Sequence, residues 1–117
     1  MDTLPRSERL RGKVAVSALM SKGRWGYSRG LKYCVLKDDA RSGANRVMVA
    51  VPKRLFKRAV KRNLLKRRLR EAYRTQKLIL EPAGTDLLLL YNTKEEMDFL
   101  TIKKSVETVL TTIADEG

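Results

Sequence analysis

The middle of the chain, residues 53 to 77, combines a dense positive charge with the apolar spacing of an amphipathic helix. Apolar residues recur there at i, i+4, i+7 and i+8, a period that collects them on one face of a helix. They are Leu65, Leu69, Ala72 and Tyr73, with Val60 near the start. The period predicts a helix from about residue 56 to residue 77 whose apolar face packs into a core.

The opposite face of this predicted helix is cationic. Residues 53 to 77 hold twelve Lys or Arg against Glu71 alone, a net charge of +11. Four residues at i, i+4, i+7 and i+11 form an outward stripe: Asn63, Arg67, Arg70 and Arg74. Lys66 and Lys77 lie beside this stripe. Like charges at i, i+4 oppose helix formation by roughly a few tenths of a kcal/mol per pair. A polyanion bound along the stripe would offset that cost.

The positive charge of the whole chain is concentrated in this segment. The 117 residues include 26 Lys or Arg and 13 Asp or Glu, a net charge of +13. Residues 1 to 52 carry a net +7, and residues 78 to 117 a net −5. A generic solvated surface mixes both signs, whereas Lys and Arg that neutralise phosphates release counterions on binding. The distribution therefore favours a polyanionic partner.

The sequence has no His and one Cys, Cys34. Nucleophile arrangements that need His are excluded, and so are the ligand sets of zinc and haem. The carboxylate pairs Asp38-Asp39 and Glu95-Glu96 have no basic or nucleophilic partner marked by spacing. We therefore expect no catalytic residue and no metal bound by protein ligands.

Compartment and domain organisation follow from what the sequence lacks. Cys34 has no partner for an intrachain disulfide, and no apolar run approaches the about 20 residues of a membrane span. The N-terminus also has no continuous apolar segment of the kind found in signal peptides. We expect a single domain over residues 1–117, located in the cytoplasm.

Shorter periodic segments flank the basic one and predict an α/β fold. Helical spacing indicates a helix on each side, strict alternation indicates strands, and one short apolar run indicates a buried strand. The segments are residues 13–22 (helix, stopped by Gly23), 31–36 and 47–51 (strands, joined by a loop through Ser42-Gly43), 87–91 (buried strand) and 102–113 (helix). We expect a two-layer sandwich of about four strands and three helices.

Two features of the sequence, Asn63 and the aromatic pair Trp25 and Tyr27, each allow two interpretations. Asn63 is either a solvent-facing defect in the helix or a ligand for a phosphate or ribose among its cationic neighbours. Trp25 and Tyr27 lie between Gly23 and Gly30 and are either core aromatics or part of a loop that stacks on bases.

The basic segment resembles the signature of the bacterial ribonuclease P protein subunit. The matching stretches are Val51-Pro52-Lys53-Arg54 and the run AVKRNLLKRRLREAYR at residues 59–74. The family has a short Val-Ser-Lys-Lys-like strand end, followed by a helix with an Arg-Asn-Arg triplet and a Lys-Arg-x-x-Arg-Glu run. Leu4-Pro5 is similar to the family's N-terminal opening, and the late apolar strand to its last strand.

The resemblance implies a left-handed β-α-β crossover, against the usual right-handed rule. It also implies a protein that assists a catalytic RNA in removing the 5′ leader from precursor tRNA, with Mg²⁺ acting through the RNA. Partners would be the ribonuclease P RNA and precursor tRNA, and the free protein would be a monomer. RNA-contacting positions carried over, with their neighbours on the stripe, are Lys53, Arg54, Lys61, Arg62, Asn63, Lys66, Arg67, Arg70 and Arg74.

This sequence departs from the family pattern in several places. Leu64 replaces the second Arg of the triplet, Pro52 replaces a small hydroxyl residue, and one residue is added between the strand end and the helix. Family members also tend to line a cleft for the single-stranded leader with aromatic residues. The corresponding positions here are Val16, Met20 and Cys34.

Two other classes of protein remain as alternatives. A small basic ribosomal or RNA-chaperone protein would carry a similar charge without needing this helix motif. A self-sufficient nuclease would need paired carboxylates or a His beside the cationic helix, where Glu71 stands alone.

Overall fold

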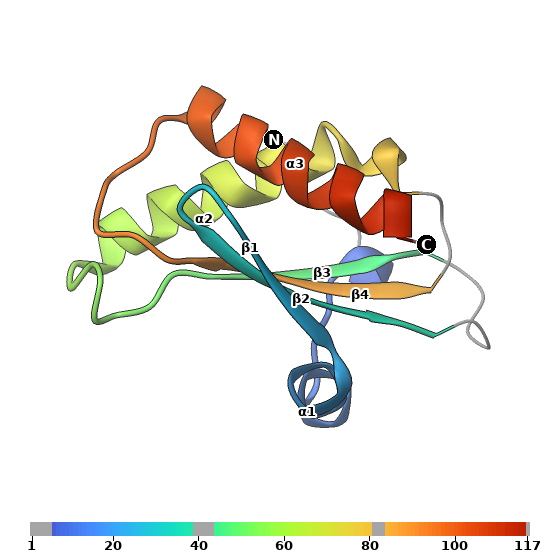
Figure 1. Ribbon diagram of the computed structural model, residues 1–117. Coiled ribbons are helices and arrows are strands. Elements are labelled where there is room, and N and C mark those ends of the chain that lie inside the picture. The colour runs from blue at the N-terminus through green and yellow to red at the C-terminus, as the bar shows by residue number, and fades with distance from the viewer. Residues whose placement is uncertain (1–5, 39–43, 81–83, 117) are drawn as a thin grey trace.

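The computed structural model describes residues 6–38, 44–80 and 84–116, so Leu4-Pro5, Asp39 and Ser42-Gly43 lie outside the described residues. A four-stranded sheet forms its centre, in the order β1-β2-β4-β3 (Figure 1). The strands are β1 (Arg24–Ser28), β2 (Leu31–Lys37), β3 (Arg46–Ala50) and β4 (Thr85–Tyr91). β2 pairs antiparallel with both β1 and β4, whereas β3 and β4 are parallel.

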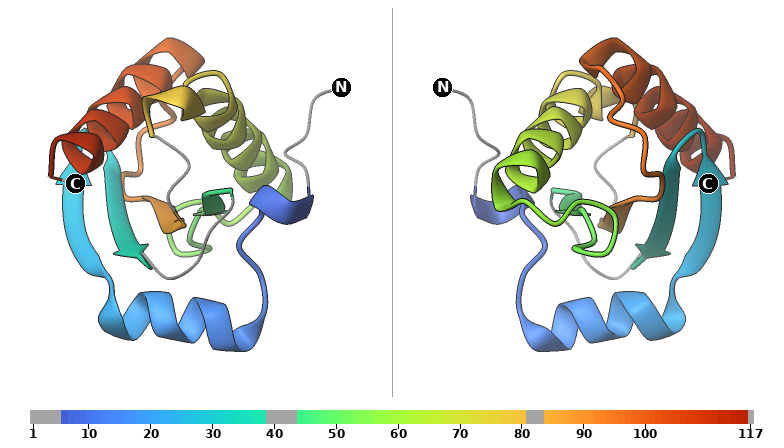
Figure 2. Two further views of the ribbon diagram at one scale, coloured as in Figure 1. Left: turned by 90° about the vertical axis from the view of Figure 1, so that its right-hand side faces the viewer. Right: turned by 90° about the vertical axis from the view of Figure 1, so that its left-hand side faces the viewer.

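Three helices cover the sheet unequally. α2 (Ala59–Arg74) and α3 (Phe99–Glu116) lie side by side on one face, and α1 (Lys13–Lys22) crosses the other (Figure 2). Two short 3-10 helices, Arg6–Glu8 and Lys77–Ile79, complete the described elements. The predicted four strands and three helices are confirmed, and α1 adds a partial layer beneath the predicted sandwich.

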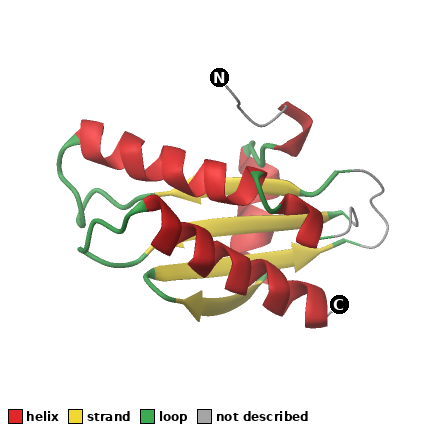
Figure 3. Ribbon diagram, turned by 90° about the horizontal axis from the view of Figure 1, so that it is seen from above, coloured by secondary structure: helices red, strands yellow, loops and turns green. Residues whose placement is uncertain are grey.

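The connection from β3 through α2 to β4 has the handedness that the family resemblance implies. In Figure 3 the two long helices lie in front of the sheet, and β3 and β4 both run from right to left. The chain leaves β3, passes in front of the sheet as α2, and returns in β4, which lies below β3 in this view. That order is a left-handed crossover, the rare exception to the right-handed rule.

The main core lies between the sheet and the helix pair. Inward residues of the strands, such as Tyr33 and Leu89, meet the apolar stripes of α2 and α3. α3 begins after Asp98, whose Oδ1 accepts a hydrogen bond from the backbone N–H of Thr101 at 2.8 Å. The face of α3 in this core consists of Ile102, Ser105, Val106, Val109, Leu110 and Ile113.

The second core, beneath α1, is much smaller. Its fully buried members are Leu10, Leu19, Cys34 and Leu88, with partly buried neighbours that include Val16 and Leu90. Leu19 is the one buried residue of α1. Leu19, with partly buried Ala15 and Val16 beside it, therefore anchors this helix on the sheet.

Two expectations about the elements are corrected. Residues 24–28 form strand β1, not a loop, because Gly26 and Ser28 pair in register with Tyr33 and Leu31 of β2. Val60 is 82% exposed and does not belong to the buried face of α2. It precedes Leu65 by five residues, about 140° around the helix, so it points outward.

The basic helix is also shorter than predicted. α2 begins at Ala59 because residues 52–55 form a turn in which Pro52 O accepts a hydrogen bond from Leu55 N. Lys77 lies beyond α2 in the following 3-10 helix, where its Nζ bonds Glu8 Oε1 at 2.7 Å.

Candidate nucleic-acid interface

α2 presents its cations on the face opposite the core. Leu65, Leu69, Ala72 and Tyr73 are no more than 1% exposed, whereas Asn63, Arg67 and Arg70 are exposed. Lys66 and Arg74 are half-buried on the flanks of this stripe. The helical phase inferred from the apolar period is therefore confirmed.

The first turn of α2 is electrostatically unfavourable without a partner. It has no acidic residue and no side-chain cap, although an unbonded helix N-terminus carries a partial positive charge. Lys57, Arg58, Lys61 and Arg62 crowd the same end. Each cation near a helix N-terminus costs roughly 0.3–1 kcal/mol at an exposed site. An anion bound here would relieve both repulsions.

Arg62 has a structural task as well as a charge. Its Nη1 donates to the backbone oxygens of Phe56 and Lys57, each at 2.8 Å. These bonds fix the segment that leads from the strand end into α2. Arg62 therefore positions the exposed Lys53 and Arg54 relative to the helix, in addition to any contact of its own.

Acidic residues neutralise part of the predicted cationic set. Lys61 Nζ lies 2.5 Å from Glu96 Oε1, and Arg68 Nη1 lies 3.6 Å from Glu96 Oε2. The hydrogen bond from Lys61 is the main reason that the pKa of Glu96 is lowered. At the other end, Arg74 Nη2 lies 2.5 Å from Glu71 Oε1. Sequence reasoning missed the role of Glu96 because it is remote in the chain.

Within the part of the chain that the structure describes, the remaining cations of this set make no ion pair with an acidic residue. Apart from Arg62, which bonds backbone oxygens, they comprise the strand end, the outward stripe and its flank: Lys53, Arg54, Lys66, Arg67 and Arg70. These five, with Asn63 among them, form the cationic face of the candidate interface. Paired Lys61 and Arg74 lie at its margins.

The three positions compared with the leader cleft do not form one surface. Met20 is 47% exposed and Val16 is partly buried, but Cys34 is fully buried. The Cys34 thiol donates to Leu19 O at 3.3 Å, and burial raises its pKa against the opposing effect of Lys32. Cys34 is therefore core beneath α1 and is not available to touch a leader.

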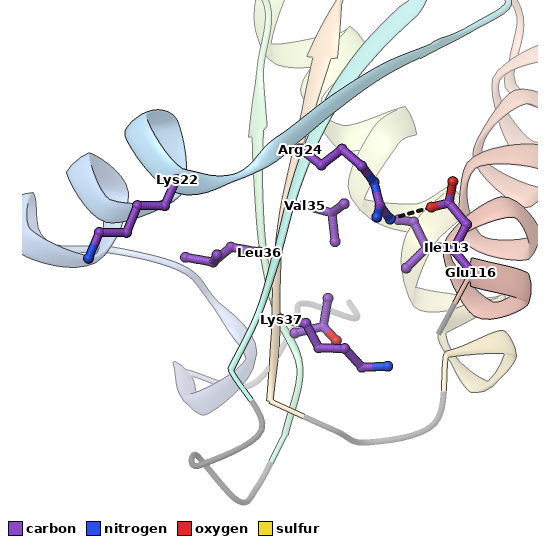
Figure 4. Close-up of a pocket in the computed structure, with 8 residues that line it drawn as sticks. Lys22, Arg24, Val35, Leu36, Lys37, Ile113 and Glu116 are labelled. Atoms are coloured by element: carbon purple, nitrogen blue, oxygen red, sulfur yellow. Dashed lines mark hydrogen bonds and ion pairs between the residues drawn. The ribbon is translucent and has the colours of Figure 1, made fainter.

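A small recess lies at the edge of the sheet, where the neighbouring side chains of Val35 and Leu36 in β2 point to opposite faces (Figure 4). Arg24 reaches Glu116 of α3 in an ion pair, with Val35 and Ile113 on the same side. Lys22 and Leu36 lie on the α1 side. Glu116 neutralises Arg24, whereas Lys22 and Lys37 also line the recess.

No helix within residues 6–38, 44–80 and 84–116 is long and apolar enough to cross a membrane. Across the same residues, no three His, Cys, Asp or Glu side chains are grouped so that they could hold a metal ion.

Solved structures share this fold. The protein of Staphylococcus aureus ribonuclease P superposes with a TM-score of 0.76 at 23% identity, over 91% of this chain and 94% of that one. The ribonuclease P protein of Thermotoga maritima superposes with a TM-score of 0.75 at 24% identity, over 90% and 96% of the two chains.

Sequence relatives carry the same name. A ribonuclease P protein component from Chlorobaculum tepidum is 42% identical over 88 residues, which is 70% of this chain but 56% of that protein. One from Porphyromonas gingivalis is 30% identical over 95% of this chain and 86% of its own length. The family model for ribonuclease P matches residues 4–114, nearly the whole chain. With this match and a cationic helix in the expected position, the chain belongs to the ribonuclease P protein family.

Proposed function

We propose that this protein is the subunit that helps a ribonuclease P RNA remove the 5′ leader from precursor tRNA. The observation that carries the proposal is the cationic face of α2, which pairs a rigid buried back with exposed Arg67 and Arg70. A helix fixed in this way holds several phosphate-binding groups at constant spacing. Such contacts position an RNA without reading its sequence.

In this proposal the protein contributes binding and orientation, and the RNA carries the reaction. Mg²⁺ held by the RNA would stabilise charge on the reacting phosphate and activate the attacking water. The protein's cations would lower the Mg²⁺ concentration needed, because they offset phosphate repulsion between ribozyme and substrate. The free protein acts as a monomer in the cytoplasm.

The decisive experiment measures cleavage of precursor tRNA by a purified ribonuclease P RNA at low Mg²⁺, with and without this protein. We expect the protein to raise the cleavage rate strongly under these conditions. The double variant Arg67→Ala/Arg70→Ala should lose most of this stimulation. Lys104→Ala, which removes an exposed cation from α3, should keep it.

Two outcomes would contradict the proposal. A protein that binds RNA but never accelerates cleavage would fit a ribosomal or chaperone role instead. Cleavage by rigorously RNA-free protein would contradict the assignment of the chemistry to the RNA.

A further inference from the structure

The segment between β4 and α3, residues 92–98, runs past the N-terminal end of α2 (Figure 1). Its Glu96 forms an ion pair with Lys61 on the first turn of α2, and the two side chains keep 40% and 39% of their surface exposed. Arg68, about two helical turns beyond Lys61, lies 3.6 Å from the other carboxylate oxygen of Glu96. A polyanion in solution can therefore reach this pair without opening the core.

Glu96 is the carboxylate that meets the crowded cations of the first turn of α2. In the described part of the chain, no other acidic side chain forms an ion pair with the cations of that end, which are Lys57, Arg58, Lys61 and Arg62. The hydrogen bond from Lys61 lowers the pKa of Glu96, so its carboxylate is charged at neutral pH. Glu96 therefore relieves, from within the protein, the repulsion that an external anion would otherwise relieve.

The ion pair is not what holds residues 92–98 in place. The hydroxyl of Tyr91 donates to Glu95 O at 2.6 Å and accepts from the backbone N–H of Met97 at 2.8 Å. Arg68 Nη1 donates to Met97 O at 2.8 Å, and the Met97 side chain is buried. The backbone on both sides of Glu96 is thus anchored without its carboxylate. Since an exposed ion pair also adds little to stability, the placement of Glu96 against α2 calls for another explanation.

A carboxylate and a phosphate bind the same cations. Both present oxygen atoms that accept charge-assisted hydrogen bonds from ammonium and guanidinium groups. An RNA phosphate that approaches the first turn of α2 can therefore replace the carboxylate of Glu96 on Lys61. Arg68 keeps its bond to Met97 O during this exchange, so Lys61 is the cation that changes partner.

We propose that Glu96 is an internal counterion that a phosphate of the RNA displaces from Lys61 when the RNA binds α2. The proposal rests on the proposed function for the identity of that RNA, which would be the ribonuclease P RNA. In the free protein Glu96 reduces repulsion among the first-turn cations, and in the complex the phosphate takes over this role. Separation of Glu96 from Lys61 opposes binding. Glu96 is therefore a positioning residue that acts through Lys61 and limits the affinity for RNA.

Residues 92–98 supply a matched control for the change in charge. Glu96→Gln and Glu95→Gln each remove one negative charge from adjacent exposed positions, but within the described residues only Glu96 is paired with a cation of α2. The full-length variants are titrated with purified ribonuclease P RNA at fixed salt and Mg²⁺. We expect Glu96→Gln to bind about two- to fivefold more tightly than Glu95→Gln, because no exposed ion pair has to be separated. Equal affinities would contradict the proposal.

A double-mutant cycle tests whether the gain in affinity passes through Lys61. Lys61→Ala removes the cation that the phosphate would take from Glu96. It should weaken binding more in the Glu96→Gln background than in the unaltered protein, because only there is Lys61 unpaired before the RNA arrives. In either background it should reduce the slope of log affinity against log salt by about one. The proposal is wrong if Lys61→Ala has the same effect in both backgrounds, or if the slope does not change.

Urea unfolding separates this role from a structural one. Glu96→Gln and Glu95→Gln should unfold at nearly the same urea concentration, whereas a marked loss of stability together with weaker RNA binding in Glu96→Gln would overturn the proposal. Cleavage of precursor tRNA is measured in parallel. If the unaltered protein stimulates cleavage but the two variants bind the RNA equally, the proposed function stands and the counterion role fails. If the protein binds the RNA without stimulating cleavage, the function fails and the cycle still tests the exchange, and absence of RNA binding would reject both.

Discussion

The inward and outward faces of α2 belong to the same sixteen residues but obey different physical demands. The inward face is sealed, and Leu65, Leu69 and Ala72 have no exposed surface. The outward face bears Asn63, Arg67 and Arg70, which are exposed. The comparison shows that burial of the apolar face stabilises the helix and offsets the repulsion among the cations of the other face. Changes on the two faces should therefore separate stability from RNA binding.

The largest effect on stability is expected from Leu69→Ala. Truncating a fully buried leucine removes apolar contacts and leaves a cavity, at a cost of about 2–5 kcal/mol in the free energy of unfolding. The cations of α2 remain, so RNA affinity measured well below the unfolding midpoint should stay unchanged. Urea unfolding and RNA titration test both statements. A variant that folds normally but loses RNA binding would show that the helical phase is wrong.

The next effect concerns Tyr73, also on the inward face. Burial, aided by the charge of Glu8, raises the pKa of Tyr73 to about 12 from 10.0. The neutral form is therefore favoured in the folded protein. Its contribution to the free energy of unfolding is fully present below pH 10 and is lost as pH rises toward 12. Between pH 9 and pH 11, Tyr73→Phe should lose about 1.4 kcal/mol less unfolding free energy than the unaltered protein. Equal losses, measured by urea unfolding, would show that this hydroxyl does not drive alkaline unfolding.

A smaller effect, on binding alone, is expected from single cations of the outward face. Arg67→Ala or Arg70→Ala should each reduce the slope of log affinity against log salt by about one, because each removes a phosphate contact. The paired substitution Glu71→Gln/Arg74→Gln leaves the net charge unchanged and should hardly alter the slope. Unchanged slopes in all variants would place the RNA elsewhere on the protein.

The smallest effect on stability is expected at Asn63. This side chain is exposed on the outward face, so Asn63→Ala should change the free energy of unfolding by no more than about 0.5 kcal/mol. It should nevertheless weaken binding of the ribozyme or its precursor substrate, since an amide can bond a phosphate or ribose. Normal affinity would favour the alternative of a solvent-facing residue. Unfolding of the variant would contradict the assigned phase.

Sequence periodicity predicted the long elements because their burial is one-sided. α2 and α3 each repeat apolar residues over several turns, and that pattern survives any detail of packing. β1 escaped prediction because it has no apolar residue on its inward side. Gly26 occupies the inward position, where a Cβ atom would lie 2.4 Å from the ring of Tyr33. The ring of Tyr33 fills the space where an apolar side chain of β1 would lie, so the alternating apolar pattern of a strand is missing from the sequence of β1.

The sequence predicted which face of α2 carries the candidate site, but it did not predict which of the cations there are free of ion pairs. The i, i+3 spacing of Glu71 and Arg74 could have indicated their ion pair from sequence. The pairing of Lys61 with Glu96 could not, because it joins residues 35 positions apart through the tertiary fold. The same holds for Lys32 and Trp25, which meet only because β1 pairs with β2.

The attachment of α1 through Leu19 has a consequence for the protein's motions. Partly buried Ala15 and Val16 pack beside that side chain, and at the end of the helix the Gly23 N–H and the Cys34 thiol both donate to Leu19 O. Opening this helix exposes far less apolar surface than unfolding the sheet. The free energy of local opening is therefore a fraction of the free energy of global unfolding. Amide hydrogens in α1 should exchange with solvent well before those of β4, and a ligand that spans α1 and the sheet should slow that exchange. Native-state hydrogen exchange would thus detect occupancy of the open face without any label.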